Sequence, residues 1–202
     1  MSLDPDRDLV MACQADPPEG LEGGFRDLYE QYKDRIYNVC YRITGNPADA
    51  LDAAQETFGI LFRKIDGFRF ESRFSSWVYR IAVNASIDLK RRAANRRLPS
   101  LDQMTQIRGE DSPSLEPVDE AAPSPIESAA TEELELEVQA AITRLSPKMR
   151  GITVLRYMQG LSYEEISISL GISLGTVKSR LARAHQALDR ELTPLLDRHG
   201  LR

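Results

Sequence analysis

The segment from residue 173 to residue 190 carries polar and basic side chains that suit contact with duplex DNA. Five of them lie in the first turns of an expected helix: Thr176, Lys178, Ser179, Arg180 and Arg183. Such a helix enters the major groove, about 12 Å wide, with its early side chains on base edges and its cations on phosphates. The pattern predicts a DNA-reading helix; the alternative is an ordinary amphipathic helix on a bundle surface.

A second group of side chains that suits nucleic acid lies between residues 72 and 92. Four polar residues, spaced seven, four and seven apart, share one side of an expected helix: Arg73, Arg80, Asn84 and Arg91. Trp77 borders that side, and Tyr79 also lies outside the arc expected to face the core. Arginines that hold a backbone and rings that stack on bases suit a single strand, with stacking worth ~1–3 kcal/mol per base. Alternatively, Trp77 and Tyr79 are residues at the edge of the core.

Capping signals delimit the elements that would position the first group. Ser162 and Glu165 fit a capping box, Gly171 suits a left-handed turn, and Ser173 suits the N-cap of the next helix. Apolar residues then recur at steps of three and four: Leu174, Val177, Leu181, Ala184 and Leu188. The pattern indicates a helix-turn-helix whose second helix buries this apolar seam.

The upstream group needs a helical bundle to position it. An apolar stripe runs from Phe25 to Ile43, Gly45 ends that helix, and Asn46-Pro47 begins the next. The core face of this next helix is expected at Leu51, Ala54, Phe58, Leu61, Phe62 and Ile65. The third helix is expected to bury Phe74, Val78, Ile81, Ala82, Ala85 and Leu89.

The whole chain of 202 residues has helical periodicity and lacks the alternation typical of strands. We therefore expect an all-α protein of two helical domains, at 21–97 and 131–202. Residues 98–130 are rich in proline, serine and acidic residues, which indicates a flexible acidic linker. Residues 1–20 are expected to form an N-terminal tail.

Composition argues against several classes of function. Cys13 and Cys40 are far apart, only two histidines are present, and no carboxylates cluster, so we expect no catalytic residues, no metal, no cofactor and no enzyme activity. We expect no membrane span and no signal peptide, and hence a cytoplasmic protein. The net charge of −5 conceals two basic clusters on either side of the acidic linker, so free DNA should bind weakly unless a partner assists.

Two stretches of the sequence then become informative together. They are DALDAAQETFGILFRKIDGFRFESRFSSWVYRIAVNASIDLKRR (49–92) and SPKMRGITVLRYMQGLSYEEISISLGISLGTVKSRLARA (146–184). In this order they resemble the extracytoplasmic-function (ECF) sigma factors of bacterial RNA polymerase. The resemblance implies a transcription initiation factor with a region 2-like domain at 21–97 and a region 4-like domain at 131–202.

The resemblance also implies roles for individual residues. Contact with core RNA polymerase is expected at Asp52, Gln55 and Glu56. Recognition and melting of the −10 promoter element is expected at Arg73, Trp77, Tyr79, Arg80, Asn84 and Arg91. The −35 element is expected to be read by Thr176, Lys178, Ser179, Arg180 and Arg183. Promoter DNA, core RNA polymerase and an anti-sigma factor are the partners implied.

Two other functions compete with this interpretation. A stand-alone regulator would use the helix-turn-helix as a dimer, but it leaves the helix bearing Trp77 and Asn84 unexplained. An enzyme acting on nucleic acid would need clustered carboxylates or a metal site.

Overall fold

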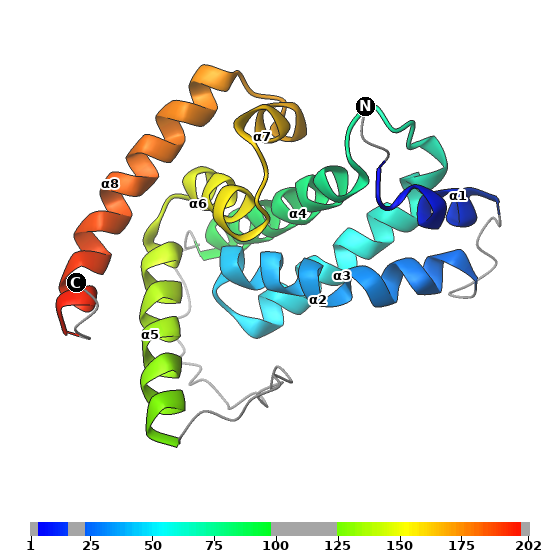
Figure 1. The fold of residues 1–202 in the computed structure, drawn as a ribbon. Coiled ribbons are helices and arrows are strands. Elements are labelled where there is room, and N and C mark those ends of the chain that lie inside the picture. Colours follow the sequence, from blue (N-terminus) through cyan, green and yellow to red (C-terminus); the bar gives the residue numbers. More distant parts are fainter. Residues whose placement is uncertain (1–3, 16–22, 98–124, 199–202) are drawn as a thin grey trace.

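The computed structural model describes residues 4–15, 23–97 and 125–198, all of whose regular elements are helical (Figure 1). The N-terminal part contains α1 (Arg7–Ala15), α2 (Gly24–Thr44), α3 (Pro47–Lys64), a 3-10 turn (Ile65–Gly67) and α4 (Phe74–Arg97). The C-terminal part contains α5 (Pro125–Arg144), α6 (Pro147–Thr153), a π-helical turn (Val154–Met158), α7 (Tyr163–Leu170) and α8 (Leu174–Arg198). The expected all-α class is confirmed.

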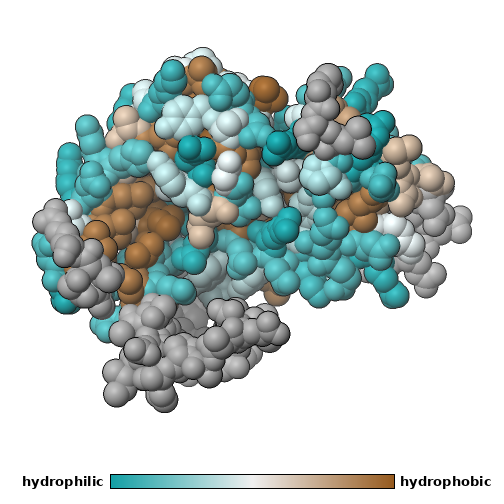
Figure 2. All heavy atoms as spheres, viewed as in Figure 1, coloured by the Kyte–Doolittle hydropathy of each residue, from teal (hydrophilic) through white to brown (hydrophobic). Residues whose placement is uncertain are grey.

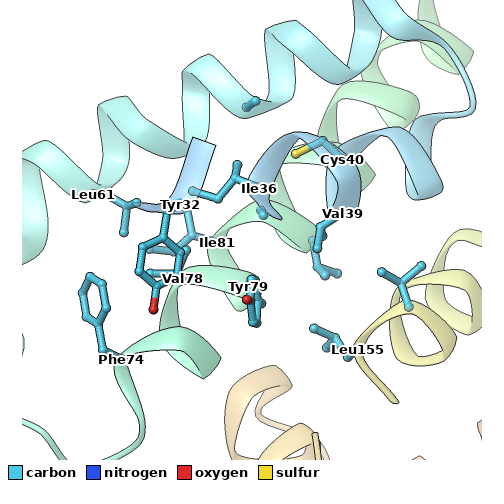
Figure 3. Close-up of a cluster of buried hydrophobic side chains, with 14 of the residues drawn as sticks. Tyr32, Ile36, Val39, Cys40, Leu61, Phe74, Val78, Tyr79, Ile81 and Leu155 are labelled. Carbon is cyan, nitrogen blue, oxygen red and sulfur yellow. The ribbon is translucent and has the colours of Figure 1, made fainter. Parts of the chain in front are cut away.

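The N-terminal bundle forms because α2, α3 and α4 each bury an apolar stripe against the other two. Tyr32, Leu61, Phe74 and Val78 are fully buried at its centre, and Figure 3 shows them in one cluster. The predicted boundaries between α2 and α3 are confirmed. Gly45 ends α2 in a left-handed conformation (φ 70°), and the Asn46 side chain accepts a hydrogen bond from the Asp49 amide at 3.0 Å.

Residues 1–20, expected to form a tail, include a helix that packs on this bundle. Val10 and Cys13 of α1 are 0% and 2% exposed. Asp6 is buried, and its carboxylate accepts hydrogen bonds from the Tyr32 hydroxyl (2.5 Å) and the Gln31 side-chain amide (2.8 Å). Burial, followed by the bond to Asp6, raises the pKa of Tyr32 well above its usual range. The described segment 4–15 therefore packs as part of this bundle. The sequence did not predict this, because α1 is short and has few apolar residues.

The C-terminal bundle confirms the expected helix-turn-helix. Ser162 Oγ accepts from the Glu165 amide at 3.1 Å, and the Glu165 carboxylate accepts from the Ser162 amide at 2.8 Å. Gly171 adopts a left-handed φ of 62°, and Val177, Leu181 and Ala184 of α8 are buried as predicted. Helix α5 begins at Pro125, inside the range 98–130 expected to be a linker; residues 98–124 lie outside the described residues.

The two bundles contact each other directly (Figure 1). The buried guanidinium of Arg150 donates to the Ile43 carbonyl at the end of α2 and to the Thr143 and Leu145 carbonyls at the end of α5. No carboxylate pairs with Arg150 in these contacts. The carbonyl groups left free at two helix ends offset part of the cost of burying this cation, while its Nε has no hydrogen-bond partner among the described residues. Gly151 lies so close to α4 that an added Cβ would be 2.8 Å from Val83 Cγ1.

Two predicted details of the core were wrong. Leu51 was expected in the core face of α3 but is 52% exposed, because the smaller Ala50, Ala53 and Ala54 face α2 and α4 instead. Tyr79 was expected outside the core arc of α4 but is only 4% exposed. Its neighbour one turn on, Val83, is 1% exposed and faces Gly151 of the other bundle, so α4 is buried on two sides.

Candidate nucleic-acid and polymerase interfaces

The first turns of α8 present a polar surface fixed in rotation by the buried seam beneath it. Ser173 Oγ accepts from the Thr176 amide at 3.1 Å and lies 2.8 Å from the Thr176 hydroxyl, which caps the helix. Lys178, Ser179 and Arg183 are exposed, and Arg180 is half-buried. The structure thus brings together all five residues predicted to read duplex DNA, with their cations free to reach phosphates.

Five of the six residues predicted to bind the −10 element lie on or just before the exposed face of α4, and Tyr79 is the exception. Arg73, Asn84 and Arg91 are exposed, whereas Arg80 and Trp77 are half-buried. The indole of Trp77 packs against Phe68 and Phe74, with ring centroids 5.1 and 5.7 Å apart. An aromatic ring that is held on one side and open on the other is suited to stack on a base.

Tyr79 does not join this face. Burial raises the pKa of its hydroxyl, and Figure 3 shows its ring in the cluster that contains Val39 and Leu155. Leu155 belongs to the C-terminal bundle and is fully buried. The Tyr32 ring of α2 lies beside it, with ring centroids 6.4 Å apart. Periodicity within α4 alone could not reveal this burial, because another helix supplies the neighbouring surface.

Ion pairs hold some of the predicted cations in place. Arg73 Nε lies 3.5 Å from Glu165 of α7, and Arg91 lies 3.1 Å from Asp88 one turn back on α4. Both arginine side chains are largely exposed, so each pair contributes little to stability and releases its arginine at small cost.

The outer surface of α3 presents two of the three residues predicted to contact polymerase. Asp52 and Gln55 are exposed, while Glu56 is half-buried with its carboxylate 3.8 Å from Arg92 of α4. Gln55 also lines an open cavity of about 490 Å³ between α2 and α3. Its wall is mainly apolar and includes Phe25, Tyr29, Leu51, Phe58 and Phe62. The sequence did not predict this groove, because Leu51, Phe58 and Phe62 were all expected on the core face of α3.

A further apolar surface lies on the C-terminal bundle. Figure 2 shows it in the hollow between α5 and α8. Val138 of α5 and Leu188 and Leu192 of α8 are half-buried on these helices.

The described helices include none long and apolar enough to cross a membrane.

A helix-turn-helix bundle beside a second bundle that carries exposed arginines and a half-buried tryptophan is typical of a two-domain DNA-binding protein. Comparison with known families makes this class specific. Residues 28–96 match sigma-70 region 2, and residues 135–188 match sigma-70 region 4.

Curated relatives match along most of the chain. ECF RNA polymerase sigma factor SigW of Bacillus subtilis is 35% identical over 178 residues, 88% of this chain and 93% of SigW. RNA polymerase sigma-H factor of Pseudomonas aeruginosa is 33% identical over 97% of this chain and 98% of its own length. The chain spans 59% of SigE of Mycolicibacterium smegmatis, to which it is 36% identical. The chain belongs to the ECF sigma factors: it is a promoter-specific transcription initiation factor.

Solved structures share the fold. The sigma factor RpoE of Bartonella quintana, in complex with the anti-sigma factor NepR, has a TM-score of 0.63 at 21% identity, covering 84% of this chain and 96% of that one. CnrH, in complex with the cytosolic domain of CnrY, has a TM-score of 0.61 at 21% identity, covering 95% and 97%.

Proposed function

We propose that the start of α8 reads the −35 promoter element. Thr176 and Ser179 are suited to base-edge contacts, and Lys178, Arg180 and Arg183 to bases or phosphates. All five lie at the start of α8, outside the stripe of buried apolar residues, and this supports the assignment.

The exposed face of α4 is the corresponding candidate for recognition and melting of the −10 element. Trp77 would stack on an unpaired base, Asn84 would bind a base edge, and Arg73, Arg80 and Arg91 would hold the strand. Tyr79 is left out of this set, because its burial assigns it to packing.

Core RNA polymerase would bind the outer surface of α3 through Asp52, Gln55 and Glu56. The apolar groove beside Gln55 supports a protein partner there, since exposed apolar patches rimmed by polar groups are typical of interaction sites. An anti-sigma factor that covers this surface would compete with polymerase. The protein would act without catalysis of its own, in the compartment that holds the polymerase, the cytoplasm.

The proposal depends mainly on one observation. The polar site on α3 lies in the region 2 match and the polar site on α8 in the region 4 match, so the two sites are on different parts of the chain. It predicts that the two activities separate on mutation. Arg183→Ala should weaken promoter binding by about 5- to 150-fold, which corresponds to the ~1–3 kcal/mol of one arginine contact, and leave core polymerase binding unchanged. Gln55→Ala with Glu56→Ala should do the reverse.

Binding of labelled protein to bacterial core polymerase and binding of the assembled holoenzyme to promoter DNA would measure the two steps. Lys148→Ala, at the start of α6, and Lys64→Ala, at the end of α3, are control substitutions at exposed cations outside both proposed sites. If Arg183→Ala and the α3 variant impair the same step, the division of roles is wrong.

A further inference from the structure

The connection between α3 and α4, residues 65–73, is held in place by the N-terminal helix from outside the matched family region. That region begins at residue 28, and α1 lies before it. The Gln14 side-chain amide donates to two carbonyls of the connection, Ile65 at 2.8 Å and Phe68 at 3.0 Å. One side chain of α1 thus binds two backbone carbonyls of the connection. Between Gly67 and the start of α4, the connection has no regular secondary structure.

The far end of the connection is held by the residues that precede and begin α1. The Asp4 carboxylate accepts from the Phe74 amide at 2.7 Å, which caps the start of α4 from 70 positions upstream. The guanidinium of Arg7 lies over the Phe70 ring, 4.7 Å from its centroid. Both ends of the connection therefore depend on α1 and its approach.

The backbone of this connection is strained at one residue. Phe70 has a φ of 57°, the only positive φ at a non-glycine residue in the described part of the chain. A bulky side chain in this conformation is costly and persists only where the surroundings enforce it. Arg7 and Phe68 supply such surroundings, since the Phe68 and Phe70 rings also pack edge to face, 5.0 Å apart.

The connection touches the proposed −10 site through Phe68. The Phe68 ring is buried and packs on Trp77 at 5.1 Å, while its carbonyl accepts from Gln14. A shift of this backbone would therefore move the ring against which the Trp77 indole rests. Arg69, Glu71 and Arg73 of the same connection are exposed beside it.

We propose that α1 positions the 65–73 connection and, through Phe68, the Trp77 indole, and so sharpens base selection at the −10 element. Asp4, Arg7 and Gln14 are positioning residues in this account; none of them touches DNA. The inference rests on the proposed role of Trp77 and adds a determinant of selectivity in a segment outside the matched region.

The test is run-off transcription by the holoenzyme on a promoter library randomised at both elements. Gln14→Met keeps the length of the side chain and removes both donated bonds. Arg7→Ala removes an exposed side chain, so the bundle retains its core. Met11→Ala, also on α1 and 50% exposed, is the matched control. Preference among bases at the −10 element should fall by about two- to tenfold in both variants, because a base stacked on a displaced Trp77 indole would shift against the base-edge contact proposed for Asn84.

Base preference at the −35 element, affinity for core polymerase and the behaviour of Met11→Ala should stay as in the wild type. An unchanged −10 preference, or an equal loss on every promoter, would overturn the inference, because general destabilisation lowers all promoters alike. If the wild-type protein drives no promoter-specific transcription at all, the proposed function is wrong, and the inference that depends on it is wrong too.

Discussion

At the scale of single residues, Ser162 decides where the first helix of the helix-turn-helix begins. Its side chain and that of Glu165 satisfy each other's backbone amides. We predict that Ser162→Ala lowers the free energy of unfolding by ~1 kcal/mol, the usual value of an N-cap. Chemical denaturation measures it. Ser146→Ala is the control, since Ser146 begins α6 without a side-chain cap bond and its loss should have a smaller effect. Equal effects would contradict the account.

The two cysteines give a residue-scale prediction about pH. Burial raises the pKa of both thiols to about 11, with the carboxylate of Asp27 adding to the effect at Cys13. In the folded protein they should stay protonated and react slowly with a thiol reagent at pH 8, and react fast after unfolding. Because the unfolded chain ionises first, stability should fall as the pH rises from about 9 to about 11. Rapid labelling of the folded protein would contradict this.

At the scale of elements, the crossing of α1 and α2 depends on Gly24. A Cβ at this position would lie 2.8 Å from the Cys13 backbone nitrogen, which cannot rotate away as a side chain can. Gly24→Ala should therefore push α1 outward and cost ~1–3 kcal/mol of stability, as overpacking does. Thermal unfolding measures the loss. Gly67→Ala is the control, because a Cβ there meets nothing within 4 Å, and a comparable loss in both would contradict the close contact.

Most elements could be predicted from sequence because each carries its own local signal. Helix α8 has a continuous apolar seam, and Asn46, Ser162 and Gly171 mark ends by chemistry that acts within a few residues. Helix α1 offered too few apolar residues in too short a span. The burial of Tyr79 and Val83 could not be predicted for a different reason. Tyr32 of α2 lies beside Tyr79, and Gly151 of the other bundle lies beside Val83. The periodicity of one helix predicts which of its residues are exposed. It cannot predict which residues another helix or the other bundle will cover.

At the scale of the whole molecule, the two bundles share one interface built around Arg150 and Gly151. Because Gly151 allows α6 to approach Val83 of α4, a larger side chain should act as a wedge. We predict that Gly151→Leu separates the bundles and increases the radius of gyration of the free protein. Small-angle X-ray scattering measures it. Gly175→Leu is a matched control, since a Cβ there meets only the Ser173 hydroxyl at 3.9 Å. Identical scattering from Gly151→Leu and wild type would contradict the interface.

Charge also acts at this scale. The chain is acidic overall, yet the residues proposed to read the −35 element include three cations at the start of α8. Long-range repulsion should keep affinity for free DNA low, and the local cations should act once polymerase holds the protein on the promoter. This accounts for a DNA-binding protein with a net charge of −5.

The most direct measurement is run-off transcription with bacterial core polymerase on a promoter library, with and without the protein. Transcripts that depend on the protein and share two promoter elements are the predicted result, and they would give the sequence it reads. Silence with core polymerase, together with specific binding to duplex DNA in its absence, would contradict the account and indicate a stand-alone regulator.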